Sequence, residues 1–174
     1  MHALEIGGRT KLDPKSDWTL LNIEPGREVD VVADAAERLP FPDDLYDVIY
    51  ASHVLEHMAW QRTVAVLAEW RRVLRPGGLL EVWVPDFGRI VQAFITRVLP
   101  DGWLRENGGG DPFLWAVGRL FGVGGSEHNW HRSAFDATHL ESCLRRAGFA
   151  DVFPLARPRG ADHGIVNLGR GARK

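Results

Sequence analysis

Several acidic and small residues of this 174-residue chain fall at the ends of short apolar runs, where strands are expected. Glu5, Gly7 and Gly8 close the first run. Glu24 and Asp34 close the next two. A carboxylate accepts two hydrogen bonds from a vicinal diol or from an amine, and glycine lets a ligand approach the backbone closely. This pattern is typical of a site for a nucleotide-like ligand.

Each of these residues also has a structural interpretation. A glycine pair after a strand is common in tight turns, and Glu24 precedes a Pro-Gly turn. Asp34 is well placed to cap the short segment 35–38. The interval between Gly7 and Glu24 favours a ligand role, because dinucleotide folds place a ribose-binding acid at about this spacing. The sequence leaves both interpretations of Glu24 open.

Histidines supply the groups that can move a proton. His53 follows an apolar run that ends at Ser52, and His57 lies on the same predicted helix. Such a pair can bind a metal ion, but no third ligand is evident in the sequence, so we predict no metal site. His131 lies in the segment 128–132, which is rich in polar and aromatic groups. We interpret that segment equally as a catalytic loop or as a surface loop.

The apolar runs and the turn residues between them predict the order of elements. Strands are expected at residues 4–6, 20–23, 29–33, 48–51, 79–84, 149–155 and 164–168. Helical periodicity is found at residues 53–74, 90–99, 111–121 and 136–147. Strands that alternate with helices favour a mostly parallel sheet, so the carboxyl ends of the strands are expected to share one rim.

Composition and charge exclude several classes of protein. The chain has 21 basic and 23 acidic residues, and so lacks the net positive field that nucleic-acid binding usually needs. Its single cysteine, Cys143, excludes an intrachain disulfide and suits a reducing compartment. We find neither a secretory leader nor an apolar run long enough to span a membrane. We therefore expect a cytoplasmic protein with no nucleic-acid partner and no membrane insertion.

The length of the chain fits a single domain, residues 1–174. Within it, residues 100–132 contain three of the seven tryptophans, Trp103, Trp115 and Trp130. Aromatic faces suit sugar rings, and aromatic residues are also enriched at subunit interfaces. We interpret residues 100–132 as an insertion, either on the substrate side or at the interface of a homodimer.

Taken together, several motifs resemble the class I S-adenosylmethionine-dependent methyltransferases. The motifs are LEIGG, the acid at Glu24, DAAERLPFPDDLYDVIYASHVLEH and RRVLRPGGLLEVWVPD. The nearest resemblance is to a small bacterial, type-11-like branch, and it covers residues 4–86. The later segment HRSAFDATHLESCLRRAGFADV is similar to the ending of that family. The resemblance implies an α/β fold with a Rossmann-like, mostly parallel sheet of seven strands, the last one antiparallel, and helices on both faces.

The resemblance also implies that the cofactor is S-adenosylmethionine, and that the chain is an enzyme. Glu5, Gly7 and Gly8 would lie beside the methionine part of this cofactor. Glu24 would bind the ribose hydroxyls.

The resemblance assigns the adenine and the reactive sulfonium to later residues. Asp34 and Ala35 would flank the adenine. Ser52 and His53 would border the sulfonium. If the acceptor is a hydroxyl group it needs a base, and His131 or His53 is the candidate.

The implied reaction is methyl transfer to a small-molecule acceptor, for which we expect a sugar or glycan-precursor hydroxyl. The chain departs from the family at Arg9 and Lys11, which stand where further glycines are usual, and in a reduced first crossover helix. The alternative is therefore a catalytically silent domain of the same fold, acting as a cofactor-binding or assembly module.

Overall fold

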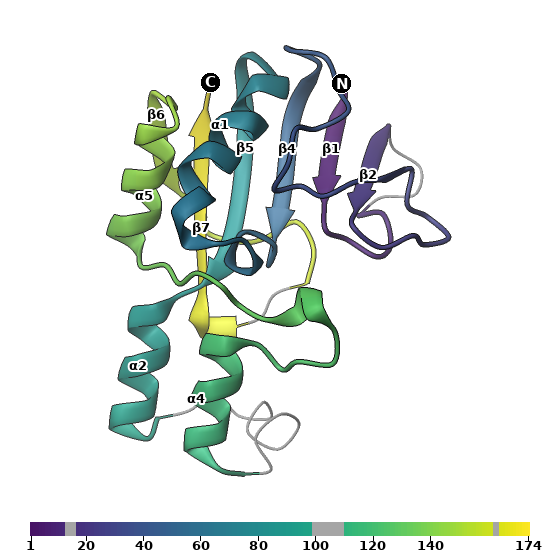
Figure 1. Ribbon diagram of the computed structural model, residues 1–174. Coiled ribbons are helices and arrows are strands. Elements are labelled where there is room, and N and C mark those ends of the chain that lie inside the picture. The colour runs from purple at the N-terminus through teal and green to yellow at the C-terminus, as the bar shows by residue number, and fades with distance from the viewer. Residues whose placement is uncertain (13–16, 99–109, 162–163) are drawn as a thin grey trace.

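The computed structural model describes residues 1–12, 17–98, 110–161 and 164–174 (Figure 1). Seven strands form one sheet in the order β3-β2-β1-β4-β5-β7-β6. Their bounds are β1 Ala3–Ile6, β2 Trp18–Asn22, β3 Val31–Val32, β4 Tyr46–Ser52, β5 Leu74–Pro85, β6 Asp151–Pro154 and β7 Asn167–Arg173. The pairs from β3 to β5 are parallel, whereas β7 runs antiparallel to β5 and to β6. The predicted fold class is confirmed, including the antiparallel last strand.

Helices connect the strands in the second half of the chain. The α-helices are α1 Thr63–Val73, α2 Phe87–Thr96, α4 Pro112–Phe121 and α5 Ala137–Arg146. The 3-10 helices are η1 Leu55–His57, η2 Trp60–Arg62, η3 Glu127–Asn129 and η4 Gly164–Val166. Asp111 and Asp136 cap α4 and α5 by accepting hydrogen bonds from backbone N–H groups in the first turn. None of the described helices combines the length and the apolar character needed to cross a membrane.

The predicted helix at 53–74 is only partly correct. The α-helix begins at Thr63, and η1 and η2 occupy the residues before it. His53 has a φ of 56°, in the left-handed region, which a continuous right-handed helix does not accommodate. His53 and His57 therefore do not share the face of one helix, and the expectation that they do is wrong.

The predicted strand at 164–168 is also misplaced. Residues 164–166 form η4, and β7 begins at Asn167 in a glycine-rich stretch with little apolar character. Gly169 and Gly171 leave room for aromatic rings, because a Cβ at either position would collide with Trp83 or Phe153. This strand therefore contains small residues that pack under aromatic rings. A search of the sequence for apolar runs does not detect it.

One face of the sheet is covered by α1 and α5 (Figure 1). The side chains of Leu67, Trp70 and Val73 on α1 are fully buried in the main hydrophobic core. The indole N–H of Trp70 donates a hydrogen bond of 3.0 Å to the carbonyl oxygen of Ala35. This contact ties the segment after β3 to the helix layer.

The other face has a smaller apolar cluster, to which no described helix contributes a residue. Its buried members are Ala3, Trp18, Val48, Tyr50 and Trp83. The side chains of Leu12 and Leu155, which lie outside the strands, pack against this cluster. The described part of the first crossover, residues 7–12, forms no helix, as the sequence predicts.

The segment after β6 is held against the second face of the sheet by side-chain contacts. Arg159 forms two hydrogen bonds of 2.6 Å with the carboxylate of Glu81 on β5. Its guanidinium also lies 5.7 Å from the ring of Trp18 on β2. The backbone N–H of Gly160 donates to the hydroxyl of Tyr50 on β4. These contacts reach three strands of the sheet, so the segment takes the place that a helix occupies on the first face.

Replacing Arg159 by alanine should therefore destabilise the fold. The change leaves the carboxylate of Glu81, whose side chain is 10% exposed, without its charged partner. We expect the free energy of unfolding to fall by about 1–3 kcal/mol. The matched control is Arg145→Ala, which removes an exposed pair with Glu141 and should cost about 0.5 kcal/mol or less. Denaturant unfolding measures both variants, and equal losses would contradict this account of the second face.

Candidate active site

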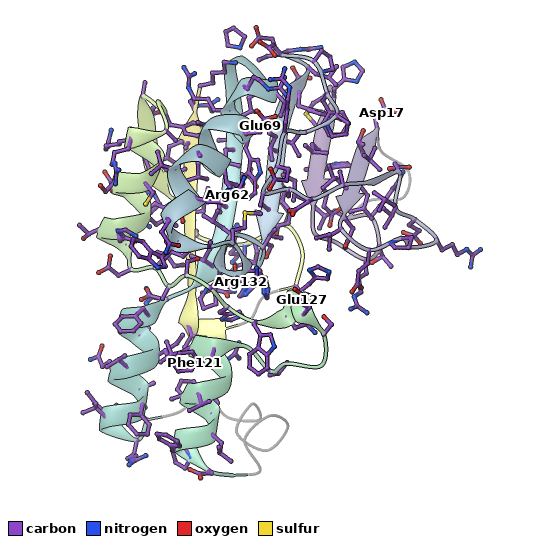
Figure 2. The ribbon with its side chains drawn as sticks, viewed as in Figure 1. Asp17, Arg62, Glu69, Phe121, Glu127 and Arg132 are labelled. Carbon is purple, nitrogen blue, oxygen red and sulfur yellow. The ribbon has the colours of Figure 1, made fainter. Side chains whose placement is uncertain are left out.

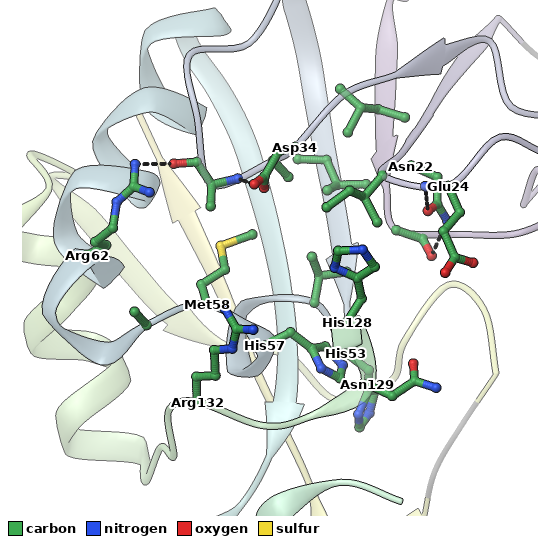
Figure 3. Close-up of a pocket in the computed structure, with 18 of the residues that line it drawn as sticks. Asn22, Glu24, Asp34, His53, His57, Met58, Arg62, His128, Asn129 and Arg132 are labelled. Atoms are coloured by element: carbon green, nitrogen blue, oxygen red, sulfur yellow. Dashed lines mark hydrogen bonds between the residues drawn. The ribbon is translucent and has the colours of Figure 1, made fainter. Parts of the chain in front are cut away.

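A cavity of about 300 Å³ opens at the carboxyl ends of β1, β2 and β4 (Figure 3). These strands are parallel neighbours, so their carboxyl ends lie at the same edge of the sheet. The volume is in the range of small-molecule binding sites. The predicted residues that line the cavity are Gly7, Glu24, Asp34, Ala35 and His53.

Four other predicted residues, Glu5, Gly8, Ser52 and His131, are not among those that line the cavity. Glu5 is buried, and its carboxylate accepts a hydrogen bond of 2.9 Å from the backbone N–H of Leu12. Burial raises the pKa of this carboxyl group, and the hydrogen bond only partly offsets the rise. Glu5 thus supports the loop that follows β1 from behind.

Gly7 adopts a backbone conformation that other residues rarely take. Its φ is 87°, and a Cβ at this position would collide with the side chain of Val54. Glycine is therefore needed here both for the left-handed backbone and for the close approach of the segment after β4. The second condition could not be read from the sequence.

Asn22, which we did not predict, joins the two ligand-facing loops. Its side-chain amide donates hydrogen bonds to the carbonyl oxygens of Gly7 and Gly8, at 3.1 and 2.9 Å. Its side-chain oxygen accepts a hydrogen bond of 2.9 Å from the backbone N–H of Glu24. One side chain therefore fixes the glycine loop relative to the predicted ribose-binding acid. The only sequence signal was its place at the end of a predicted strand.

Glu24 faces the cavity with Arg9 beside it. The guanidinium of Arg9 lies 3.9 Å from the carboxylate, and the two side chains are 84% and 50% exposed. An exposed pair at this distance contributes at most about 1 kcal/mol. Arg9 therefore leaves Glu24 free to exchange this partner for the hydroxyl groups of a ligand.

Asp34 performs the structural role that the sequence left open. Its carboxylate accepts a hydrogen bond of 2.8 Å from the backbone N–H of Ala36. Arg62 holds the same segment by donating hydrogen bonds to the carbonyl oxygen of Ala36 and to the carboxylate of Glu37. A cap and a ligand contact are compatible, because a carboxylate offers more than one acceptor site.

His53 has both ring nitrogens engaged. Nε2 lies 2.9 Å from the side-chain oxygen of Asn167, and Nδ1 lies 3.1 Å from the carboxylate of Glu56. Burial alone would lower the pKa of His53, but the hydrogen bond and the charge of Glu56 outweigh it and raise the pKa. A histidine held in this way is better suited to shaping the wall of the cavity than to accepting a proton.

His131 lies behind the cavity wall, close to Glu56 and His57. Its ring makes an edge-to-face contact with the ring of His57, with 4.9 Å between the centroids. Burial lowers the pKa of His131, and the neighbouring His57 and His53 act in the same direction against the charge of Glu56.

Basic and polar residues line the part of the cavity opposite the two carboxylates (Figure 3). In the view of Figure 2, Arg132 and Glu127 lie between the lower end of the sheet and α4. The lining residues on this side are His57, His128, Asn129 and Arg132. The sequence marked the segment 128–132 as polar and aromatic, but did not show which of its side chains reach the cavity.

The predicted insertion at 100–132 is described only in part. Trp103 lies outside the described residues. Trp115 is fully buried in a cluster with Ile90 and Val166, so its ring is not available to stack on a ligand. Trp130 is 51% exposed, and its ring packs against Gly124. Of the tryptophans used in the prediction, only Trp130 offers an exposed ring in the described chain.

The conformation of Gly7 gives a prediction for stability. In Gly77→Ala the new side chain meets open space at a φ of 76°, so only backbone strain of about 1–3 kcal/mol is expected. In Gly7→Ala the strain is similar, but the collision with Val54 adds about 1–3 kcal/mol more. Denaturant unfolding of the two variants makes the comparison, and equal losses would show that the contact with Val54 is unimportant.

Comparison with known families agrees with the resemblance. The model of a family described as "Methyltransferase domain" matches residues 12–82. A ubiquinone/menaquinone biosynthesis C-methyltransferase, UbiE, of Cupriavidus metallidurans is 38% identical over 82 residues, which cover 44% of this chain and 32% of that protein. This chain therefore spans about a third of the length of that relative.

Solved structures share the fold over almost the whole chain. A SAM-dependent methyltransferase from Archaeoglobus fulgidus has a TM-score of 0.63 at 16% identity, covering 99% of this chain and 86% of that one. The 1,6-didemethyltoxoflavin-N1-methyltransferase of Burkholderia thailandensis, with bound S-adenosylhomocysteine, has a TM-score of 0.58 at 17% identity and covers 99% and 70% of the two chains. At these identities the likeness concerns the fold.

Proposed function

We propose that this chain, which belongs to the class I S-adenosylmethionine-dependent methyltransferase family, transfers a methyl group from that cofactor to a small-molecule acceptor. The observation that carries the proposal is the joint position of Gly7, Glu24 and Asp34 on one cavity at the strand ends. Asn22 links the first two by hydrogen bonds, so they form one preorganised wall.

In this proposal the cofactor lies along the rim in the order of the strands. The methionine part lies beside Gly7, with Glu5 and Gly8 supporting that loop from behind. Glu24 accepts hydrogen bonds from the ribose hydroxyls. Asp34 and Ala35 flank the adenine, where the carboxylate can accept a hydrogen bond from the exocyclic amine.

The sulfonium then lies near His53, at the end of β4, with Ser52 behind the wall. An electron pair of the acceptor, a lone pair on oxygen or a π pair at an electron-rich carbon, attacks the methyl carbon. The carbon–sulfur bond breaks, and its electron pair stays on the sulfur of the neutral product. A carbon acceptor then loses the proton from the methylated carbon. Little acid–base chemistry is needed for this displacement, so alignment of the acceptor supplies most of the acceleration. For a hydroxyl acceptor the proton leaves as well. Of the two candidate bases, His53 lines the cavity but has both ring nitrogens engaged, and His131 would act through His57, whose ring it contacts.

Two acceptor classes are open within this proposal. A sugar or glycan-precursor hydroxyl is supported by Arg132 and His128, which line the cavity and suit a phosphate or carboxylate on such a precursor. A carbon atom of a quinone precursor is supported by the name of the Cupriavidus relative, a ubiquinone/menaquinone biosynthesis C-methyltransferase that is 38% identical over 82 residues. A panel containing both acceptor classes, assayed with labelled cofactor, separates them.

Two further parts of the proposal concern the surroundings of the domain. A homodimer through α2 and α4 is supported by the exposed apolar side chains of Ile95, Phe113 and Leu114. The region 100–132, which includes α4, would then serve as the interface and as part of the substrate side. A cytoplasmic, reducing location is supported by the buried free thiol of Cys143.

Replacing Glu24 by alanine tests the proposal directly. We expect the dissociation constant for S-adenosylhomocysteine to rise about 10- to 100-fold, because hydrogen bonds to a charged group contribute about 1.5–3 kcal/mol. Isothermal titration calorimetry measures the change. Glu127→Gln is the matched control, since it removes one negative charge near the cavity without removing a lining residue, and its affinity should stay within about twofold.

The titration of the unmodified chain also separates the proposal from its alternative. If no heat of binding is found at millimolar S-adenosylhomocysteine, the proposed function is wrong. If the cofactor binds but no acceptor in the panel is methylated, the catalytically silent module becomes the better interpretation.

A further inference from the structure

Three potential metal ligands from two distant segments meet in the wall of the cavity. Glu56 and His57 come from η1, and His131 follows η3. One ligand atom from each of the three lies within 4.8 Å of the other two. Two imidazoles and a carboxylate form the ligand set of several zinc enzymes and of non-haem iron sites.

The carboxylate of Glu56 needs a positive partner. The residue is 1% exposed, and a buried ionised carboxylate is costly unless it is paired. Oε1 lies 3.1 Å from Nδ1 of His53, but Oε2 has no hydrogen-bond partner within the described part of the chain. Oε2 of Glu56 is therefore available to bind a ligand from outside the described part of the chain.

One ring nitrogen of His57 contacts a backbone carbonyl. Its Nδ1 lies 3.3 Å from the carbonyl oxygen of Trp130, and a carbonyl oxygen can only accept a hydrogen bond. Nδ1 therefore carries the proton, and the lone pair of Nε2 remains available. Metal-binding histidines commonly donate their second N–H to a carbonyl in this way.

The backbone holds the two segments in contact without any ion. The carbonyl oxygen of Glu56 accepts hydrogen bonds from the backbone N–H groups of Arg132 and Ser133, at 2.7 and 3.0 Å. The hydroxyl of Ser133 donates to the carbonyl oxygen of Leu55. The backbone N–H of His131 donates to the carbonyl oxygen of Phe121. These hydrogen bonds thus hold the three ligand atoms within 4.8 Å of one another without an ion.

We propose that Glu56, His57 and His131 bind one divalent transition-metal ion of the Zn²⁺ class in the wall of the cavity. Three protein ligands leave at least one coordination position open. Because His57 lines the cavity, an acceptor oxygen or a water molecule can reach the ion from that side. This inference replaces the sequence-based prediction of no metal site, which lacked a third ligand because His131 is remote in the chain.

The ion would give the acceptor side of the cavity a Lewis acid. Its chemistry there is to favour the ionised form of a bound hydroxyl or water. That role rests on the proposed methyl transfer, whereas metal binding itself does not.

Metal binding can be measured directly on untagged, chelator-treated protein. Titration with Co²⁺ followed by visible absorbance, with Zn²⁺ as competitor, should give one ion per chain and bands of four- or five-coordinate cobalt. In His57→Ala and His131→Ala we expect affinity to fall at least about 100-fold, since even the loss of an indirect contact costs about 10- to 100-fold. His128→Ala is the matched control, because it removes a cavity histidine of the same segment that is not in the cluster, and should bind as the unmodified chain does.

A second measurement guards against variants that fold poorly. Added Zn²⁺ should raise the melting temperature of the unmodified chain and of His128→Ala, but not that of His57→Gln or His131→Gln. The proposal is overturned if the unmodified chain binds neither Co²⁺ nor Zn²⁺ at 1 mM. The dissociation constant would then be weaker than about 1 mM. The proposal is also overturned if His128→Ala loses as much affinity for the metal ion as His131→Ala does. S-adenosylhomocysteine titrations of the same samples report on the methyltransferase proposal separately.

Discussion

Parallel pairing of β1 with both β2 and β4 is the constraint on which the candidate site depends. The register aligns Ile6 with Leu21 and with Ala51, so the chain leaves all three strands at the same level. Gly7, Glu24 and His53 then meet at one cavity although they are far apart in the sequence. Hydrogen bonds then hold the loops that leave these strands in place. Those of Asn22 are the clearest case, because they join two of the loops.

A second docking contact completes the site from the other side. The segment that contains His131 is held against η1 by the backbone of Glu56, and this brings Arg132 and His128 to the cavity. The cavity therefore has an acidic part built by the strand ends and a basic part built by a loop. This division suits a cofactor with ribose and amine groups on one side and an acceptor that carries oxygen atoms on the other.

The sequence predicted what depends on local patterns, namely six of the seven strands, the helices α4 and α5, and the acids at strand ends. It missed features that arise only from tertiary contact. Extended backbone at Met58 and Ala59 interrupts the helix that the apolar period favoured, and glycines packed under aromatic rings hid β7 from a search for apolar runs. Asn22 has no local signal of function, because its role exists only once two loops are adjacent. The Glu56, His57 and His131 cluster was missed for the same reason.

The most direct test of the account is a crystal structure of the chain with S-adenosylhomocysteine. The account predicts that the ribose hydroxyls lie within hydrogen-bond distance of the Glu24 carboxylate, that the adenine lies beside Asp34 and Ala35, and that the sulfur points toward the side of the cavity that His57 lines. A ligand bound elsewhere, or bound at the rim with its ribose away from Glu24, would contradict the account.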